Sequence, residues 1–230
     1  AVFDLPIFED FEDVYWASLP SCWRKIIDGH NPASQHRVAV SYRPDDHQER
    51  ALRFYNDYES NLNLYLITPK LNADIKHLMV SFDFNFITRD LSIEGLTIGV
   101  ISDPGNPSTF APLHFCGGAS GTFWDWKKIT YFFHDYDGNA EYIAFKAHFH
   151  YWSMHEIFID NLLIDYIPAC IPPHNPEVIN TAKTTATVDW EKGFNENKWD
   201  IKYGAIGFNP ETHGTMVTGI TSKPYDITNL

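Results

Sequence analysis

The sequence predicts an all-β chain of two consecutive β-sandwiches, and three observations lead to that fold class. Apolar and polar residues alternate with a period of two in many short runs, as expected for strands with one face on a core. Turn-forming segments such as Asp103-Pro104-Gly105-Asn106-Pro107 separate those runs. Apolar residues make up 44% of the 230 residues and aromatic residues 16%, enough for a sizeable ordered core.

Strand candidates follow one another through the first 168 residues. The clearest are residues 80–86 and 143–149, in which every second side chain is apolar. The others are residues 7–12, 23–27, 36–42, 62–67, 96–101, 126–132 and 156–166. Only residues 45–55 are a candidate for a short helix. This pattern predicts a two-sheet antiparallel sandwich or jelly roll.

Asp160 lies inside the most apolar of these strands. An ionised carboxylate buried there costs several kcal/mol unless a cation or hydrogen bonds compensate it, so we expect a bound metal or a dense polar network. The alternation also changes phase near this residue, because Ile159 lies on one face and Leu162 continues on the other. That change indicates a β-bulge or a strand covered on both faces.

A proline-rich run divides the chain. Proline cannot donate a hydrogen bond to a sheet, so we expect a first domain at residues 1–168, a linker at 169–173 and a second domain at 174–230. The second domain has about five strand candidates, with the clearest alternation around Trp190 and Trp199. Five strands fall short of the seven of an immunoglobulin-like sandwich, so we expect this sandwich to be incomplete.

Charge and missing motifs exclude several function classes. The formal net charge of -13 argues against binding to nucleic acid or anionic lipid and suits a calcium-rich exterior. Apolar runs are too short for a membrane span, and the first residues lack the basic start of a signal peptide, so we expect a soluble mature protein or an excised part of one. The sequence has no G-x-S-x-G, H-E-x-x-H or glycine-rich phosphate loop, so we do not expect an enzyme.

Five short motifs occur in the order typical of a known family. They are Phe8-Glu9-Asp10-Phe11-Glu12, Leu19-Pro20-Ser21-Cys22-Trp23, Tyr65-Leu66-Ile67-Thr68-Pro69-Lys70-Leu71, Tyr142-Ile143-Ala144-Phe145 and Ile159-Asp160-Asn161-Leu162. In this order they resemble the MAM-like jelly-roll domains of bacterial surface proteins, above all the cleaved-adhesin domains of gingipain haemagglutinin regions. Residues 174–230 similarly resemble the first five strands of a fibronectin type III module, whose missing strands we expect beyond Leu230.

The resemblance implies a structural calcium ion. Glu9 and Asp160, in the first and last strands of the jelly roll, would supply carboxylates to it. Asp28 and Asn31 would complete the shell, because calcium prefers several oxygen ligands. The alternative is that Glu9 and Asp160 face solvent or cap turns.

The resemblance also implies a secreted or cell-surface bacterial adhesin-type protein that attaches without a covalent bond to a glycan or a host protein, as part of a larger parent protein. Trp124, Tyr151 and Trp152 are the candidate ligand-binding residues, because aromatic side chains near strand ends stack on sugar rings. Their alternative role, and the alternative for Trp126, is core packing. Two other functions stay open: a ligand-free structural module of a larger secreted enzyme, and an unrecognised glycoside hydrolase.

Histidines and cysteines give two weaker hypotheses. His148, His150 and His155 have a zinc-like spacing, yet no fourth ligand is near in sequence, so exposed histidines are the simpler interpretation. Cys22 and Cys170 flank the first domain, and a disulfide between them would tie its ends together.

Overall fold

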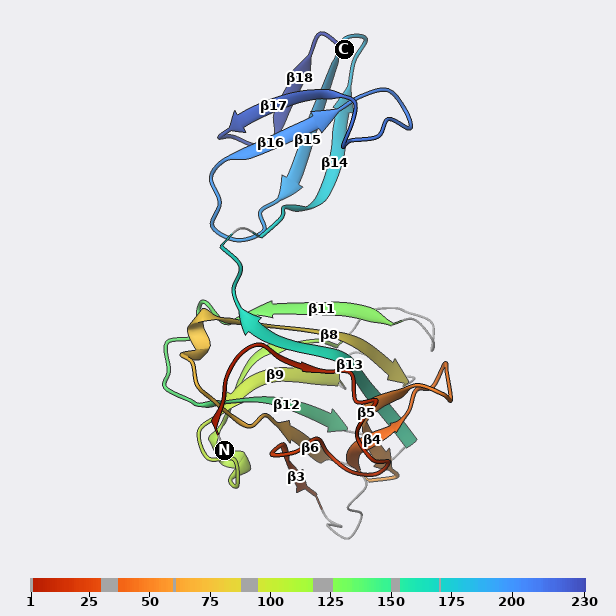
Figure 1. Cartoon of the computed structure of the whole chain (residues 1–230), viewed down its shortest axis with the longest axis vertical. Helices are drawn as coiled ribbons and strands as arrows, with labels where there is room; N and C mark the ends of the chain where they lie inside the picture. The colour runs from red at the N-terminus through yellow and green to blue at the C-terminus, as the bar shows by residue number, and fades with distance from the viewer. Residues whose placement is uncertain are drawn as a thin grey trace. The chain divides into compact units, whose positions relative to one another are not determined.

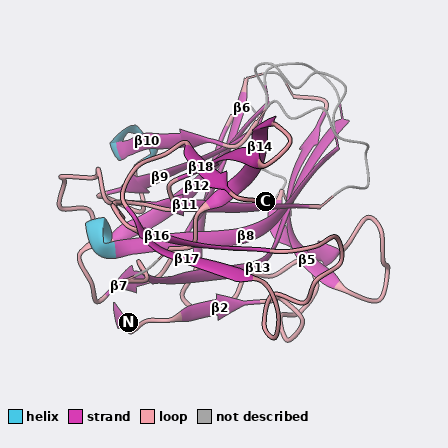
Figure 2. Ribbon diagram, turned by 90° about the horizontal axis from the view of Figure 1, so that it is seen from above, coloured by secondary structure: helices cyan, strands magenta, loops and turns pink. Residues whose placement is uncertain are grey.

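The computed structural model describes residues 2–29, 37–59, 61–87, 95–117, 126–149, 154–169 and 171–230. The chain forms two compact units, Ala1–Ile167 and Pro168–Leu230, so the division falls one residue before the expected end of the first domain (Figure 1). Strands make up nearly all of the regular structure, with two short 3-10 turns at Ile75–His77 and Pro107–Thr109 (Figure 2). No helix of the described residues is long and apolar enough to cross a membrane.

The first unit is a sandwich of two antiparallel sheets, as predicted (Figure 1). One sheet has the order β10 (Phe110–Phe115), β9 (Gly95–Ile101), β12 (Tyr142–Phe149), β6 (Leu62–Ile67) and β3 (Arg24–Asp28). The other has the order β11 (Lys127–Phe132), β8 (Leu78–Ile87), β13 (Met154–Tyr166), β5 (Arg50–Asp57) and β4 (Val38–Tyr42), and β2 (Ile7–Glu9) also pairs with β13. The short strands β1 (Val2–Phe3) and β7 (Lys70–Leu71) form a parallel pair.

Strands β2 and β13, near the two ends of this unit in the sequence, lie side by side. Ile7 is opposite Ile164 and Phe8 is opposite Leu163 in the antiparallel pair of β2 with β13. The early strand is shorter than expected, since it ends at Glu9, and Phe11 has a φ of 60° that a regular strand does not allow. The pairing joins the beginning and the end of the unit within one sheet.

The predicted β-bulge is confirmed in β13. The register with β8 shifts between Asp160 and Leu163, and Asn161 between them has a φ of 48°. The extra residue lets Ile159 and Leu162 both face the core although they are three positions apart. Asp160, which follows the core residue Ile159, lies on the outer face of the sheet just before the bulge.

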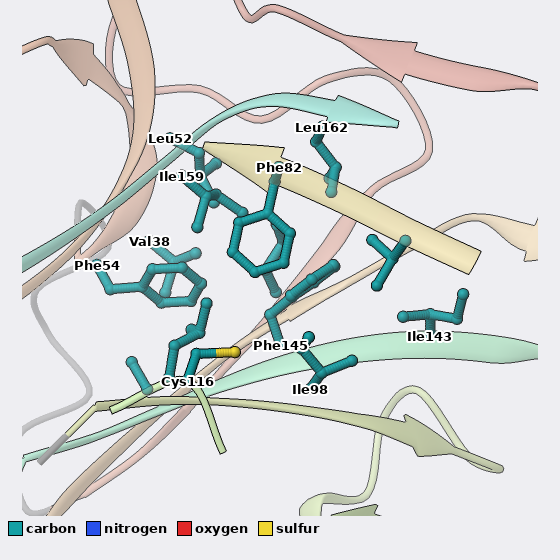
Figure 3. Packing of buried hydrophobic residues seen from close by; sticks show 14 of the residues in the cluster. Val38, Leu52, Phe54, Phe82, Ile98, Cys116, Ile143, Phe145, Ile159 and Leu162 are labelled. Carbon is teal, nitrogen blue, oxygen red and sulfur yellow. The ribbon is translucent and has the colours of Figure 1, made fainter. Parts of the chain in front are cut away.

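The core fills the space between the inner faces of the two sheets. Figure 3 shows side chains from both sheets pointing toward one another, among them Phe82 of β8 and Phe145 of β12. Both are fully buried, and their rings meet edge to face with centroids 5.5 Å apart. The period-two pattern that predicted these two strands is therefore the pattern that supplies the core.

The helix expected in residues 45–55 is wrong. Residues from Arg50 onward form β5, whose Leu52 and Phe54 are fully buried in the core. Pairing with β13 on one side and with β4 on the other decides the conformation of this segment. The sequence also failed to reveal β10, an edge strand whose side chains show no alternation of burial.

The second unit contains five strands, the number expected. The strands β14 (His174–Thr181), β15 (Thr185–Glu191) and β18 (Tyr225–Thr228) form one sheet, and β16 (Trp199–Tyr203) pairs with β17 (Thr215–Ile220) in another. Trp190, Trp199 and Ile220 form a small buried cluster. The fibronectin type III assignment stays a prediction.

Candidate functional site

Polar side chains gather on the outer face of the six-stranded sheet, opposite the core. In β8, Asp83 and Asn85 alternate with the core residues Phe82 and Phe84. The register places Asp83 opposite Asp160 of β13, and Asn85 opposite Phe158, which is itself opposite Arg53 of β5. These side chains, with Arg43, Trp126, Glu156 and Asn161, are called the outer polar face below.

An ionic network built on Asp160 forms the centre of the outer polar face. Arg43 follows β4, and its Nη1 lies 3.0 Å from Asp160 Oδ2. The same guanidinium contacts Asp45 at 3.1 Å and Glu49 at 3.2 Å. The backbone N–H of Asn161 donates to Asp160 Oδ1 at 2.7 Å, so both oxygens of the carboxylate have partners.

Burial sets the protonation of Asp160. Its exposed fraction is 3%, and desolvation raises its pKa to about 6. The Asn161 N–H and the Arg43 charge lower the pKa, while the nearby charge of Asp83 raises it. A buried acid compensated by an arginine and backbone hydrogen bonds is the dense polar network that the sequence left open as the alternative to a metal.

Aromatic rings and guanidinium groups stack on this face. The Cζ atom of Arg43 lies 4.3 Å from the ring centre of Trp126, and that of Arg53 lies 4.8 Å from the ring centre of Tyr55. Arg53 also binds Glu156 at 3.0 Å. Trp126 is half-buried, so it is a platform beside the network and not a member of the core.

Asn85 departs from the general pairing of buried polar groups, as do a few other described side chains. The side chain is 1% exposed, and neither Oδ1 nor Nδ2 has a hydrogen-bond partner. An unpaired buried amide costs about 1–3 kcal/mol, and buried polar groups are paired in nearly all cases. The register places Trp126 beside Asn85, because Lys127 is opposite Phe84. An unpaired donor and acceptor therefore lie next to the strand position of Trp126.

The structure does not bring the predicted calcium ligands together. Asp28 ends β3 in the other sheet and accepts a hydrogen bond from Asn63 at 3.1 Å. Glu9 is opposite the core residue Leu162 and accepts a hydrogen bond from Trp23, and burial raises its pKa. Asp160 binds Arg43 on the outer face. In the described residues no three His, Cys, Asp or Glu side chains form a group that could hold a metal ion, and the predicted calcium ion stays a prediction.

Several other predicted residues lie outside the described residues. They are Asn31, Trp124, His150, Tyr151, Trp152 and Cys170. His148 contacts Asn63 with its Nδ1 at 2.9 Å, and His155 is buried beside Phe149. Cys22 is exposed and carries a free thiol. Its expected bond to Cys170 stays a prediction, because Cys170 lies outside the described residues. Neither Arg43 nor Asn85 was found from the sequence, although the polar positions of residues 81–85 were a signal for the outer face.

Comparisons with solved structures support the fold of most of the chain. No family model and no curated protein sequence matches it. The K2 cleaved adhesin domain of Lys-gingipain is similar with a TM-score of 0.51 and 13% identity over 70% of this chain and 98% of that domain. The K1 domain of the same protein, from Porphyromonas gingivalis W83, has a TM-score of 0.49 and 16% sequence identity, and the match covers 71% of this chain and 99% of that domain. A carbohydrate-binding module in complex with β-1,4-galactotriose has a TM-score of 0.38 and 18% sequence identity, and the match covers 64% of this chain and 90% of that module. The expected similarity to cleaved adhesin domains is thus confirmed for the fold.

Proposed function

We propose that this chain is a non-catalytic, extracellular binding protein whose first unit binds a glycan at the outer polar face. One observation carries the proposal: Trp126 and the Arg43 network lie beside Asn85, a buried amide with no partner. A structure keeps such a group where a ligand or an ordered water completes its hydrogen bonds. The fold shared with an adhesin domain supports a binding role.

The chemistry of this face suits a sugar. Planar amide, carboxylate and guanidinium groups form paired hydrogen bonds with neighbouring hydroxyl groups, and Asn85 offers both a donor and an acceptor. The half-buried ring of Trp126 can stack on the apolar face of a pyranose. Asn85 itself is so buried that we expect it to bind a ligand hydroxyl through a water, or directly after that water leaves.

The earlier candidates Trp124, Tyr151 and Trp152 remain part of this proposal as further stacking residues. Trp124 precedes Trp126 by two positions, and Trp152 precedes the first residue of β13 by two. The starts of β11 and β13 lie at the same end of the sheet, because both strands run antiparallel to β8. Glycan or protein as the ligand, and a larger parent protein, are likewise proposals.

A glycan array with the full chain, followed by calorimetry with the best neutral oligosaccharide, tests the proposal. Trp126→Ala should weaken binding by about tenfold or more, the loss expected when about 1.4 kcal/mol of contact energy is removed. Tyr166→Ala is the matched control, because Tyr166 is an exposed aromatic residue at the other end of β13.

Asn85→Leu separates a binding role from a structural one. Replacing an unpaired buried amide by an apolar group of similar size should leave the stability unchanged or raise it by about 1 kcal/mol. Glycan affinity should fall at the same time. The proposal is wrong if the chain binds no glycan on the array, or if Trp126→Ala and Asn85→Leu both bind as tightly as the wild type.

A further inference from the structure

Strand β16 of the second unit has a regular edge that no strand of this unit covers. The sheet contains only β16 and β17. Between the pairs Trp199–Ile220 and Ile201–Val217 the register shifts, and the extra residue of this bulge lies on β17. Gly219, which lies in the bulge, has a φ of 71°. The edge of β14 is interrupted by Pro176, which has no N–H to donate. Kinks and prolines protect edges against pairing with other chains, and β16 has neither.

An open apolar groove accompanies this edge. It has a volume of about 300 Å³, and its lining includes Val178 of β14, Val188 and Trp190 of β15, and Trp199 and Ile201 of β16. Trp190 is 6% exposed, and its Nε1–H is buried without a hydrogen-bond partner. The second unit alone therefore leaves apolar side chains and main-chain groups of β16 that a further strand would cover.

The sequence of β16 is complementary to itself. It reads Trp199-Asp200-Ile201-Lys202-Tyr203, with Ile201 between an acid and a base and with an aromatic residue at each end. In an antiparallel pair of two such strands centred on Ile201, each Asp200 is directly opposite Lys202 of the other strand. Opposite charges and aromatic pairs at directly opposed positions stabilise antiparallel strands.

We propose that β16 pairs with β16 of a second copy of this chain, antiparallel about a two-fold axis at Ile201. The result is a continuous four-stranded sheet in which Trp199 and Tyr203 of the two copies cover the mouths of both grooves. Asp200 is exposed and Lys202 is half-buried, and one oxygen of Asp200 accepts the N–H of Gly219 at 2.8 Å. The second carboxylate oxygen is then directed to the lysine of the other copy. This interface goes beyond glycan binding and does not depend on it.

Charge also fixes the register of this pair. A shift by two residues in either direction places Asp200 opposite Asp200 or Lys202 opposite Lys202 of the second copy. Like charges directly opposite one another destabilise a sheet. The centred register is therefore favoured over its neighbours, which is how a sheet edge selects one partner and one alignment.

Sedimentation of the full chain over a range of concentrations tests the interface. The wild type should shift from the mass of one chain toward that of two. Lys202→Asp, which gives each edge two acids, should stay monomeric, and so should Asp200→Lys, which gives each edge two bases. An equimolar mixture of the two variants should form a dimer again, because every opposed pair then joins unlike charges.

Circular dichroism and thermal melting establish that each variant is folded. Asp200→Lys also removes the hydrogen bond from the Gly219 N–H to Asp200. If that loss unfolds the variant, Lys202→Asp alone is sufficient to test the interface. A wild type that stays monomeric at every concentration overturns the proposal. Wild-type self-association that Lys202→Asp leaves unchanged also overturns it, and so does a monomer whose β16 amides are protected from hydrogen exchange by another segment.

Discussion

Replacement of Asp160 by asparagine should remove a specific pH dependence from the stability of the first unit. The pKa of this carboxyl rises from 3.8 to about 6 on folding, because desolvation outweighs Arg43 and the Asn161 N–H. The folded state therefore binds more protons than the unfolded state between these values. Where the folded state binds more protons, stability falls as the pH rises.

The size of this effect follows from the shift. Moving the pKa from 3.8 to about 6 corresponds to about 3 kcal/mol, most of it lost as the pH rises from about 4 to about 6. The free energy of unfolding of the wild type should thus fall relative to that of Asp160→Asn over this range. Above it, the difference between the two proteins should be constant.

Urea denaturation at a series of pH values, followed by pulsed hydrogen exchange in β12, measures the first unit separately from the second. Asp165→Asn is the matched control, since the Asp165 carboxylate also accepts the following N–H at 2.7 Å but lies outside the Arg43 network. Wild-type and Asp160→Asn curves that run parallel from pH 4 to pH 7 would refute the assignment of Asp160 as a buried acid.

Three further predictions concern the core, the ion pair and the second unit. Arg43→Met should destabilise the first unit by about 3 kcal/mol at pH 7, because Asp160 then keeps a buried charge without its arginine, and by less at pH 5; equal losses at both pH values would contradict this. Phe145→Ala should cost about 3–5 kcal/mol in urea denaturation, because the fully buried ring packs against Phe82; a loss below that of a typical surface change would mean that the core is not continuous. Hydrogen exchange should be faster throughout β14 to β18 than in β8, because Trp190, Trp199 and Ile220 are a small core; equal protection in a monomer would show that the second unit is self-sufficient.

Local pattern was sufficient for several strands that have one face on the core. Residues 80–86 and 143–149 were predicted as strands, and Phe82 and Phe145 as core, because alternate side chains of a strand face the same side. The same reasoning failed for β5 and β10. In β5 the alternation begins beside a polar turn, and in β10 an edge position leaves most side chains exposed whatever their polarity.

The calcium hypothesis combines an expectation about strand pairing with an expectation about where the carboxylate side chains lie. The sequence places Glu9 and Asp160 in strands that do pair, and that part is confirmed. Pairing alone does not decide which face a side chain takes, and Glu9 is opposite a core residue while Asp160 faces outward to Arg43. The predicted calcium ion stays a prediction, without a shared site among these three carboxylates.

By itself the sequence determined that a buried carboxylate at residue 160 needs compensation, that the strand around it has either a bulge or cover on both faces, and that sheets rather than helices form the core. Only the tertiary structure decided that the compensating charge is Arg43, which is 117 residues away in the chain, and that Asn85 is left unpaired beside Trp126. The alternation of apolar and polar residues is a local property, because it depends only on residues that are neighbours in the sequence. The partner of a polar side chain depends on the register between strands that meet only after folding.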